Sequence, residues 1–239
     1  MVVKYSVGLD VSSKDIKACI STIDMQQVVK VKSSTTILNT KKGFEDLVKW
    51  INKWHVDNNV QLCICLEATG VYHENCAYYL NNLGYKISII LPNKAKKYLQ
   101  ALGLKSKNDS IDAKGLAQMG AQQNLEQWQP MGTFYYELRV LTRQHQSLQE
   151  NITAERNRLH ASAHSANQIK FGVKQIKKLI AFLEKQLEAL KKEIERHIKS
   201  NPLMQEKFKS VCKIYGVSLL SCATIIGETG GFVLFKNYK

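Results

Sequence analysis

Two aspartates lie three residues apart in the stretch "LGLKSKNDSIDAKGLAQ", which covers residues 102–118. On a helix, Asp109 and Asp112 would share one face, where two like charges repel each other. Lysines flank the pair on both sides: Lys105 and Lys107 precede it and Lys114 follows it. Paired carboxylates become favourable when they share a cation, and Mg²⁺ prefers carboxylate and water oxygens as ligands. The spacing therefore favours a metal-binding role inside a basic segment.

The elements that must position these carboxylates follow a clear order along the chain. Three strands with β-branched alternation are expected, and the short polar joints between them predict an antiparallel meander. Helices and two buried-type strands then alternate. The expected strands cover 3–10, 16–23, 27–34, 60–70 and 85–92, and the expected helices cover 41–56, 72–83, 94–102 and 110–122. This order predicts an α/β domain over residues 1–128, with a mixed sheet covered by helices in the ribonuclease-H-like (RuvC-like) arrangement.

Two further carboxylates stand at the ends of expected strands. Asp10 ends the first strand in "GLDVS", and Glu67 ends the fourth in "CLEATG". In a ribonuclease-H-like sheet these two strands are neighbours, and the last helix of the domain crosses the edge at which they end. We therefore expect four carboxylates to converge and to hold Mg²⁺ or Mn²⁺, since the ions relieve the mutual repulsion. Two such ions about 4 Å apart can clamp the attacking and leaving oxygens of a phosphodiester.

Each acid has a structural explanation when it is taken alone. An aspartate after "GL" is often a turn residue, Asp109 could simply cap a helix, and Glu67 could be an ordinary acid at a strand end. The joint pattern of strand Asp, strand Glu and helix Asp-x-x-Asp is what favours a metal site made by Asp10, Glu67, Asp109 and Asp112.

The sequence changes character past Pro130. Seven residues step by three and four along the first long helix: Leu138, Leu141, His145, Leu148, Ile152, Glu155 and Leu159. This pattern predicts a coiled-coil helical region over 129–202. The second helix carries a broader apolar stripe than one partner seam requires, which predicts a homo-oligomer, a dimer or higher. The two helices are expected to be joined near 165–172.

The last expected segment, 203–239, contains two short helical patterns around Gly216. Such a junction resembles a helix-hairpin-helix element, in which backbone N–H groups meet a phosphate. The chain stops in "FKNYK" without the capping residues of a finished domain, so this segment is expected to be the truncated start of a further domain.

The charge balance indicates a polyanionic partner. The 239 residues carry a formal net charge of +14, with a pI of about 9.4, which favours nucleic acid over an acidic membrane surface. Six lysines near the expected carboxylates are predicted to bind nucleic acid: Lys94, Lys96, Lys97, Lys105, Lys107 and Lys114. No apolar run is long enough to span a membrane and no secretory signal is seen. The six cysteines form no CxxC pair, so buried free thiols in the cytoplasm are expected.

Four stretches resemble one known family. They are "VGLDVSSKDIKACI" (7–20), "LEATGVYHENCAYYLNNLGYKISIILP" (66–92), "KSKNDSIDAKGLAQ" (105–118) and "IYGVSLLSCATIIGETG" (214–230). They are similar to motifs of the DEDD transposases of bacterial insertion sequences, the "one-ten" family that includes Piv-type DNA invertases. The resemblance implies that Asp10, Glu67, Asp109 and Asp112 carry a D-E-D-D metal set. It also implies metal-dependent DNA cleavage and joining at transposon ends and targets, guidance by a bridge RNA, and coiled-coil dimer contacts in a bacterial cytoplasmic protein.

One departure from the family pattern concerns the nucleophile. The family places a serine in its C-terminal domain, beyond residue 239, and neither Ser218 nor Ser221 matches that position. The resemblance therefore implies an N-terminal part of a transposase that is inactive alone.

Three other functional hypotheses compete with the transposase hypothesis. Actin-like ATPases and sugar kinases share the opening strands, but they need Gly-rich phosphate loops that are not seen here. A non-catalytic nucleic-acid-binding or assembly protein would make the acids incidental. A Holliday-junction resolvase or a ribonuclease H would use the same four acids with an activated water, and the sequence does not choose among these substrates.

Overall fold

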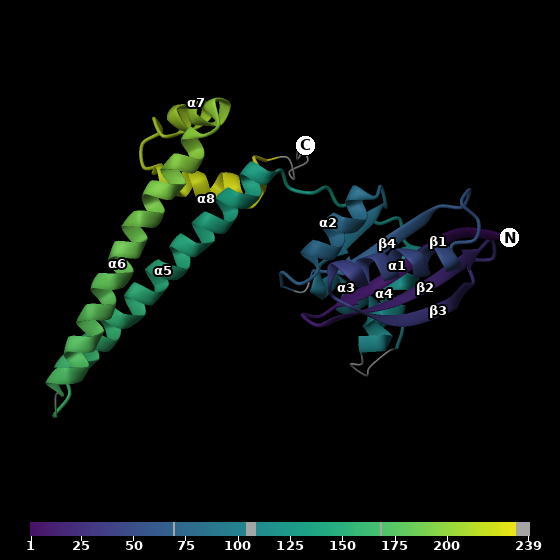
Figure 1. Ribbon diagram of the computed structural model, residues 1–239, viewed down its shortest axis with the longest axis horizontal. Helices are drawn as coiled ribbons and strands as arrows, with labels where there is room; N and C mark the ends of the chain where they lie inside the picture. Colours follow the sequence, from purple (N-terminus) through teal and green to yellow (C-terminus); the bar gives the residue numbers. More distant parts are fainter. Residues whose placement is uncertain (69, 104–108, 168, 233–239) are drawn as a thin grey trace. The chain divides into compact units, whose positions relative to one another are not determined.

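The chain forms two compact units, residues 1–130 and 131–239 (Figure 1). The computed structural model describes residues 1–68, 70–103, 109–167 and 169–232, and the side chains of 109–111 are not described. The boundaries expected from the sequence at 128 and 202 remain predictions. Within the second unit, however, residues on both sides of position 202 share one hydrophobic core, which includes Leu138, Ile194 and Phe208.

The first unit is built on a five-stranded mixed sheet with the strand order β3-β2-β1-β4-β5. The strands are β1 (Val2–Val11), β2 (Asp15–Asp24), β3 (Val29–Leu38), β4 (Leu62–Glu67) and β5 (Ile87–Ile90). The first three form an antiparallel meander, and β4 and β5 run parallel to β1. This order confirms the predicted ribonuclease-H-like fold and the expected pairing of the first and fourth strands.

The third strand is longer than its sequence pattern suggested. It was expected over 27–34, but β3 pairs with β2 from Val29 opposite Ile23 to Leu38 opposite Asp15. Strand pairing along all of β2 carries the ladder through "SSTT", which is a polar run that alternates between partly buried and exposed positions. The helix α1 (Lys41–Trp54) then begins at once, because the Thr40 hydroxyl accepts a hydrogen bond from the backbone N–H of Gly43.

One face of the sheet is covered by α1 and by α2 (Glu74–Asn82). Alternate residues of β1 and β4 contribute apolar side chains to this face, as expected for strands buried on both sides. The fully buried members include Val7, Leu9, Ile64 and Leu66 from the strands and Leu47, Ile51, Ala77 and Leu80 from the helices. This layer forms the larger core of the unit.

The opposite face of the sheet carries α4 (Asp109–Gln122), with α3 (Pro92–Ala101) packed beside it. Small residues replace large ones on this side of the strands. A Cβ atom placed on Gly8 would lie 2.1 Å from the carbonyl oxygen of Ala113 and 2.3 Å from the backbone N of Ala117. A Cβ on Gly120 would lie 2.3 Å from the sulfur of Cys65. Helix α4 therefore rests on β1 and β4 at backbone distance.

The second unit is a long helical hairpin closed at one end by two short helices. Its elements are α5 (Thr133–Ala163), α6 (Lys170–Lys199), α7 (Pro202–Val211) and α8 (Leu219–Thr229). Figure 1 shows α5 and α6 side by side. The joint predicted near 165–172 lies slightly earlier, because α5 ends at Ala163 and α6 begins at Lys170. Supercoiling of the pair remains a prediction.

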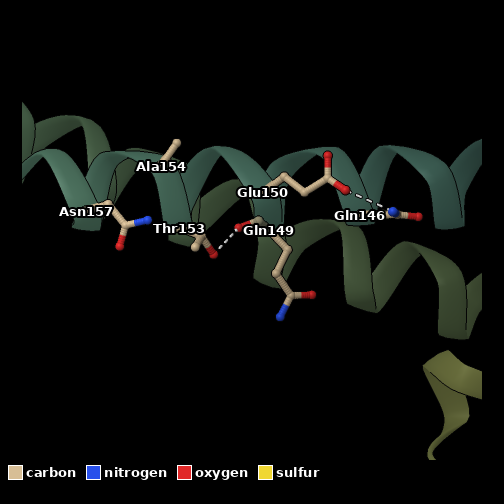
Figure 2. A pocket seen from close by; sticks show the side chains of 6 residues that line it. All are labelled: Gln146, Gln149, Glu150, Thr153, Ala154 and Asn157. Atoms are coloured by element: carbon tan, nitrogen blue, oxygen red, sulfur yellow. Dashed lines mark hydrogen bonds between the residues drawn. The ribbon is translucent and has the colours of Figure 1, made fainter.

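The predicted seam of α5 is the buried line of that helix. Leu138, His145, Ile152 and Glu155 are at most 9% exposed, and the opposite side of α5 is polar. Figure 2 shows this polar side, where the Gln146 amide donates to Glu150 and the Thr153 hydroxyl donates to the carbonyl oxygen of Gln149. The amphipathic pattern thus predicted the buried face of α5 correctly.

Helix α8 closes the unit against the start of α5. A Cβ on Gly227 would lie 3.0 Å from the backbone N of Arg139, so the two helices approach closely. Beside this contact, Arg143 donates two hydrogen bonds to the Glu228 carboxylate, at 2.6 and 2.8 Å.

The cysteines and the helices were also the subject of predictions from the sequence. All six cysteines are free thiols, as predicted; five of them are buried, but Cys212 is only partly buried. No helix in the described ranges is both long enough and apolar enough to cross a membrane.

Substitution of Gly8 by alanine tests the contact between α4 and β1. The added Cβ meets backbone atoms that cannot rotate away, so we expect a loss of about 1–3 kcal/mol in the free energy of unfolding, as for other overpacked cores. Urea denaturation followed by tryptophan fluorescence measures this unit, since Trp50, Trp54 and Trp128 all lie in it. Gly115→Ala in α4 of the same unit is the control, because a Cβ there meets only the Leu99 side chain, whose end can rotate away. Equal stability of the two variants would contradict the close contact.

Candidate functional site

Asp10 and Glu67 lie side by side at the end of two parallel strands. The register pairs Leu9 of β1 with Leu66 of β4, and the two acids are the next residues on their strands. Both side chains are partly buried. The carboxyl ends of neighbouring parallel strands meet at one edge of the sheet, and ligands bind preferentially at such edges in α/β folds.

Strand alternation places both acids on the α4 side of the sheet. Successive side chains of a strand point to opposite faces, so residues two apart share a face. Gly8, two residues before Asp10, lies against α4, and so does Cys65, two residues before Glu67. Asp10 and Glu67 therefore belong to the face that α4 covers.

Helix α4, which carries the other two predicted acids, packs on this face of the sheet. Ala113 lies directly over Gly8, and Asp112 precedes it by one residue. Asp112 is partly buried, and none of Asp10, Glu67 and Asp112 is without an interaction partner. Asp109 is the first residue of α4, but its side chain lies outside the described part of the chain.

The described side chains do not form a complete metal cluster. Among them, and therefore without the Asp109 carboxylate, no three His, Cys, Asp or Glu groups gather closely enough to hold a metal ion. The backbone contact at Gly8 nevertheless brings the helix carrying Asp112 to the strand carrying Asp10. The donor set consists of carboxylates, which suits a hard divalent cation.

Lys17 is a neighbour of the acids that the sequence reasoning missed. It lies opposite Asp10 in the antiparallel ladder between β1 and β2. Cross-strand neighbours of opposite charge attract each other, and the amine brings positive charge next to the first acid. The tight turn between β1 and β2 sets the register that pairs Lys17 with Asp10, so recognising this turn in the sequence could have identified Lys17. Ser12 fixes this turn, because its hydroxyl oxygen accepts from the backbone N–H of Asp15 and donates to the Asp15 carboxylate.

A layer of small polar groups lies beneath the acids, between the strands and α4. The Cys63 thiol donates to the carbonyl oxygen of Gly120 at 3.3 Å. The hydrogen bond with Cys65 lowers the pKa of the Cys63 thiol, and Ser6 and Lys4 lower it further. The same hydrogen bond and burial raise the pKa of Cys65. These thiols are nearly or fully buried, so we assign them to packing beneath the helix.

Asn39 ties together two loops at this edge of the sheet. Its side-chain amide donates to the carbonyl oxygen of Ser12 at 2.8 Å and to that of Tyr72 at 3.1 Å. Ser12 follows β1 just past Asp10, and Tyr72 belongs to the segment that follows Glu67. One amide group thus connects the chain beyond the first acid with the chain beyond the second.

Four of the six predicted nucleic-acid-binding lysines are described. Lys94, Lys96 and Lys97 are exposed on α3, and Lys114 is exposed on α4. Burial raises the pKa of the Cys19 thiol, and hydrogen bonds with Ser34 and Ser21, followed by the charge of Lys114, lower it. Lys105 and Lys107 lie outside the described residues.

The sequence of this chain matches the profile of a known protein family. The profile of the DEDD transposases of the IS110 type, described as "Transposase", matches residues 7–166, which is more than half of the chain. The chain belongs to this family. The match spans Asp10, Glu67, Asp109 and Asp112, and it confirms the resemblance seen in the sequence motifs.

Two curated relatives are pilin gene-inverting proteins. The protein of Moraxella lacunata is 32% identical over 158 residues, and that of Moraxella bovis is 31% identical over the same length. The alignments cover 66% of this chain and 47% of each relative. The transposase chain therefore spans about half the length of the curated relatives it matches.

Solved structures with some likeness include two kinds of Holliday junction enzyme. RuvC of Thermus thermophilus in complex with a Holliday junction aligns with a TM-score of 0.39 and 9% identity, over 52% of this chain and 99% of RuvC. The fowlpox virus resolvase in complex with junction DNA aligns with a TM-score of 0.37 and 13% identity, over 53% and 100%. At such low scores, the fold assignment of the transposase rests on its own sheet order.

Asn39→Ala should loosen the chain that follows Glu67. The substitution removes two hydrogen bonds, each of which contributes about 1 kcal/mol net. We expect faster amide hydrogen exchange in residues 70–74, measured by mass spectrometry on the intact chain. Asn52→Ala is the control, because it removes one hydrogen bond, from the Tyr85 hydroxyl, elsewhere in the same unit. Unchanged exchange at 70–74 in Asn39→Ala would show that the amide bridge does not hold this segment.

Proposed function

We propose that this chain provides the metal-dependent, DNA-cleaving part of a recombinase that moves or inverts DNA segments. One observation carries the proposal: Asp10 and Glu67 lie at the ends of adjacent parallel strands, on the face covered by α4, the helix that carries Asp112. Family membership supports it, and so do the names of the Moraxella relatives, which are said to invert a pilin gene. DNA is the proposed partner, at transposon ends and target sites in the bacterial cytoplasm.

The proposed metal ligands are the carboxylates of Asp10, Glu67, Asp109 and Asp112. When bound, Mg²⁺ or Mn²⁺ would supply charge stabilisation for an in-line displacement at phosphorus. The two strand ends fix the spacing of Asp10 and Glu67, and the docked helix sets the position of Asp112. Lys17 beside Asp10 would help to balance the charge of the acids and of a DNA phosphate.

Strand joining is proposed to need more than this set of residues. The family resemblance implies a nucleophilic serine, and the two serines at the start of α8 have structural roles. The Ser218 hydroxyl oxygen caps α8 by accepting from the backbone N–H of Ser221, and the two hydroxyls hydrogen-bond at 2.8 Å. We therefore propose that the chain alone does not join DNA strands. Guidance by an RNA belongs to the same proposal and rests on the resemblance.

Asp10→Asn tests the metal site. Loss of one charged ligand should weaken Mg²⁺ binding by at least about tenfold, which is the lower end of the effect seen for groups that support a metal ligand. Isothermal calorimetry with Mg²⁺ measures the affinity, and circular dichroism checks the fold. The matched control is Asp57→Asn, which makes the same chemical change at an exposed loop residue. Equal Mg²⁺ binding by both variants would refute the assignment of Asp10.

The exposed lysines of α3 are proposed to hold the DNA backbone. Changing Lys94, Lys96 and Lys97 together to glutamate should weaken duplex binding and flatten its salt dependence, since each phosphate contact contributes about 0.9 to the slope of log K against log salt. Fluorescence anisotropy at several salt concentrations measures both quantities. Lys41, Lys42 and Lys49 of α1, changed in the same way, give an equal change of net charge on another helix. Equal losses in the two triple variants would indicate only a general charge effect.

A homodimer or higher oligomer is proposed to form through α6. The hairpin leaves the Phe182 side chain 57% exposed and Leu179 41% exposed, beyond the seam that faces α5. Recombination also requires two DNA ends held together, which a symmetric dimer achieves. Light scattering at micromolar concentration should show a dimer mass that falls to the monomer mass in Phe182→Glu but not in Lys185→Glu. A monomeric parent chain would refute this part of the proposal.

A further inference from the structure

Two histidines lie one turn apart at the end of α5, in the helical unit. His160 is in the last turn of the helix, and His164 is the residue that caps it. Both are exposed. Their Nε2 atoms are 3.3 Å apart, and their ring centroids are 4.6 Å apart with a tilt of 54° between the planes. The two imidazoles therefore present the same ring nitrogen to each other.

The distance between these nitrogens matches the distance between two ligand nitrogens in a tetrahedral metal site. Zinc binds imidazole nitrogen at about 2.0–2.1 Å with tetrahedral geometry, which places two such nitrogens about 3.3 Å apart. A hydrogen bond between the rings explains the same contact, but at 3.3 Å it is longer than the usual donor–acceptor distance of about 2.9–3.0 Å for an N–H donor. The pair is thus already spaced for a shared ion.

We propose that His160 and His164 form a two-histidine chelate for a borderline transition-metal ion, with Zn²⁺ as the best geometric match. Neutral imidazole is a common ligand for such ions. The remaining coordination positions are open to water. The ligand chemistry separates this site from the carboxylates of the first unit, because Mg²⁺ selects oxygen ligands and zinc accepts nitrogen.

The position on the helix adds to the attraction. The last turn of a helix carries partial negative charge from its unpaired carbonyl groups, so a cation is favoured there. An ion held by both residues would link the helical turn at His160 to the capping residue, just before the chain reverses into α6. Zinc binding should therefore slow the opening of the last turn of α5.

Calorimetric titration of the untagged chain with Zn²⁺, in a large excess of Mg²⁺, tests the proposal. Excess Mg²⁺ occupies the oxygen sites, and the six cysteines contribute the same background in every variant. We expect the parent chain to bind one Zn²⁺ at least about tenfold more tightly than His160→Ala, since the second imidazole acts as an intramolecular ligand at high effective concentration. Equal isotherms for the two proteins would overturn the proposal.

A relocated histidine provides the matched control. The double variant Asn157→His/His160→Ala keeps the number of histidines but places them seven residues apart, about 10 Å along the helix, which is too far for one ion. It should bind zinc as weakly as His160→Ala. In parallel, zinc should slow amide hydrogen exchange in residues 160–164 of the parent chain and of neither variant. Parent-like binding by the double variant, or exchange unaffected by zinc in the parent chain, would show that these residues form no chelate.

Discussion

The position of α4 at the sheet edge where Asp10 and Glu67 lie depends on its close approach to β1 at Gly8. Because no side chain stands between them, the backbone of Ala113 and Ala117 contacts the strand directly. A large residue at position 8 would lift the helix by several ångströms and carry Asp112 away from Asp10. The small residues Ser6, Cys63 and Cys65 continue the same surface under Gly120. A bulky apolar layer covers the other face of the sheet, and a thin one covers this face.

The thin layer has an electrostatic consequence. Because the side chains on this face are small, the helix that carries Asp112 packs closely on the strands that carry Asp10 and Glu67. Repulsion among such groups is unfavourable without a counter-charge, and the register supplies one in Lys17 opposite Asp10. A bound cation would supply more. The register thus places two acids, Asp10 and Glu67, at neighbouring positions on parallel strands, and such like-charge pairs are common at functional sites.

The sequence predicted most of the sheet and the edge at which Asp10 and Glu67 lie, because strand alternation and apolar runs are local signals. It did not predict that Gly8 and Gly120 are packing residues, since contact between backbone atoms leaves no periodic apolar pattern. Lys17 was missed because its place depends on the register of a hairpin, which Ser12 sets through a turn. In the second unit, the seam of α5 was visible in the spacing of Leu138 and Ile152. Periodicity identifies a face but not its partner, so the sequence did not decide between α6 and a second chain.

The packing of α8 against α5 determines the order in which the helical unit can be completed during synthesis. The hairpin of α5 and α6 consists of neighbours in sequence, so it can form as soon as both helices have left the ribosome. Its open end must wait for α8, because the partner of Arg143 is Glu228, a residue 85 positions later. Until then the apolar groups around Leu138 and Ile194 lack their cover. A nascent chain paused between α6 and α8 would therefore expose this surface, which makes that interval the one in which chaperone binding or premature self-association would occur.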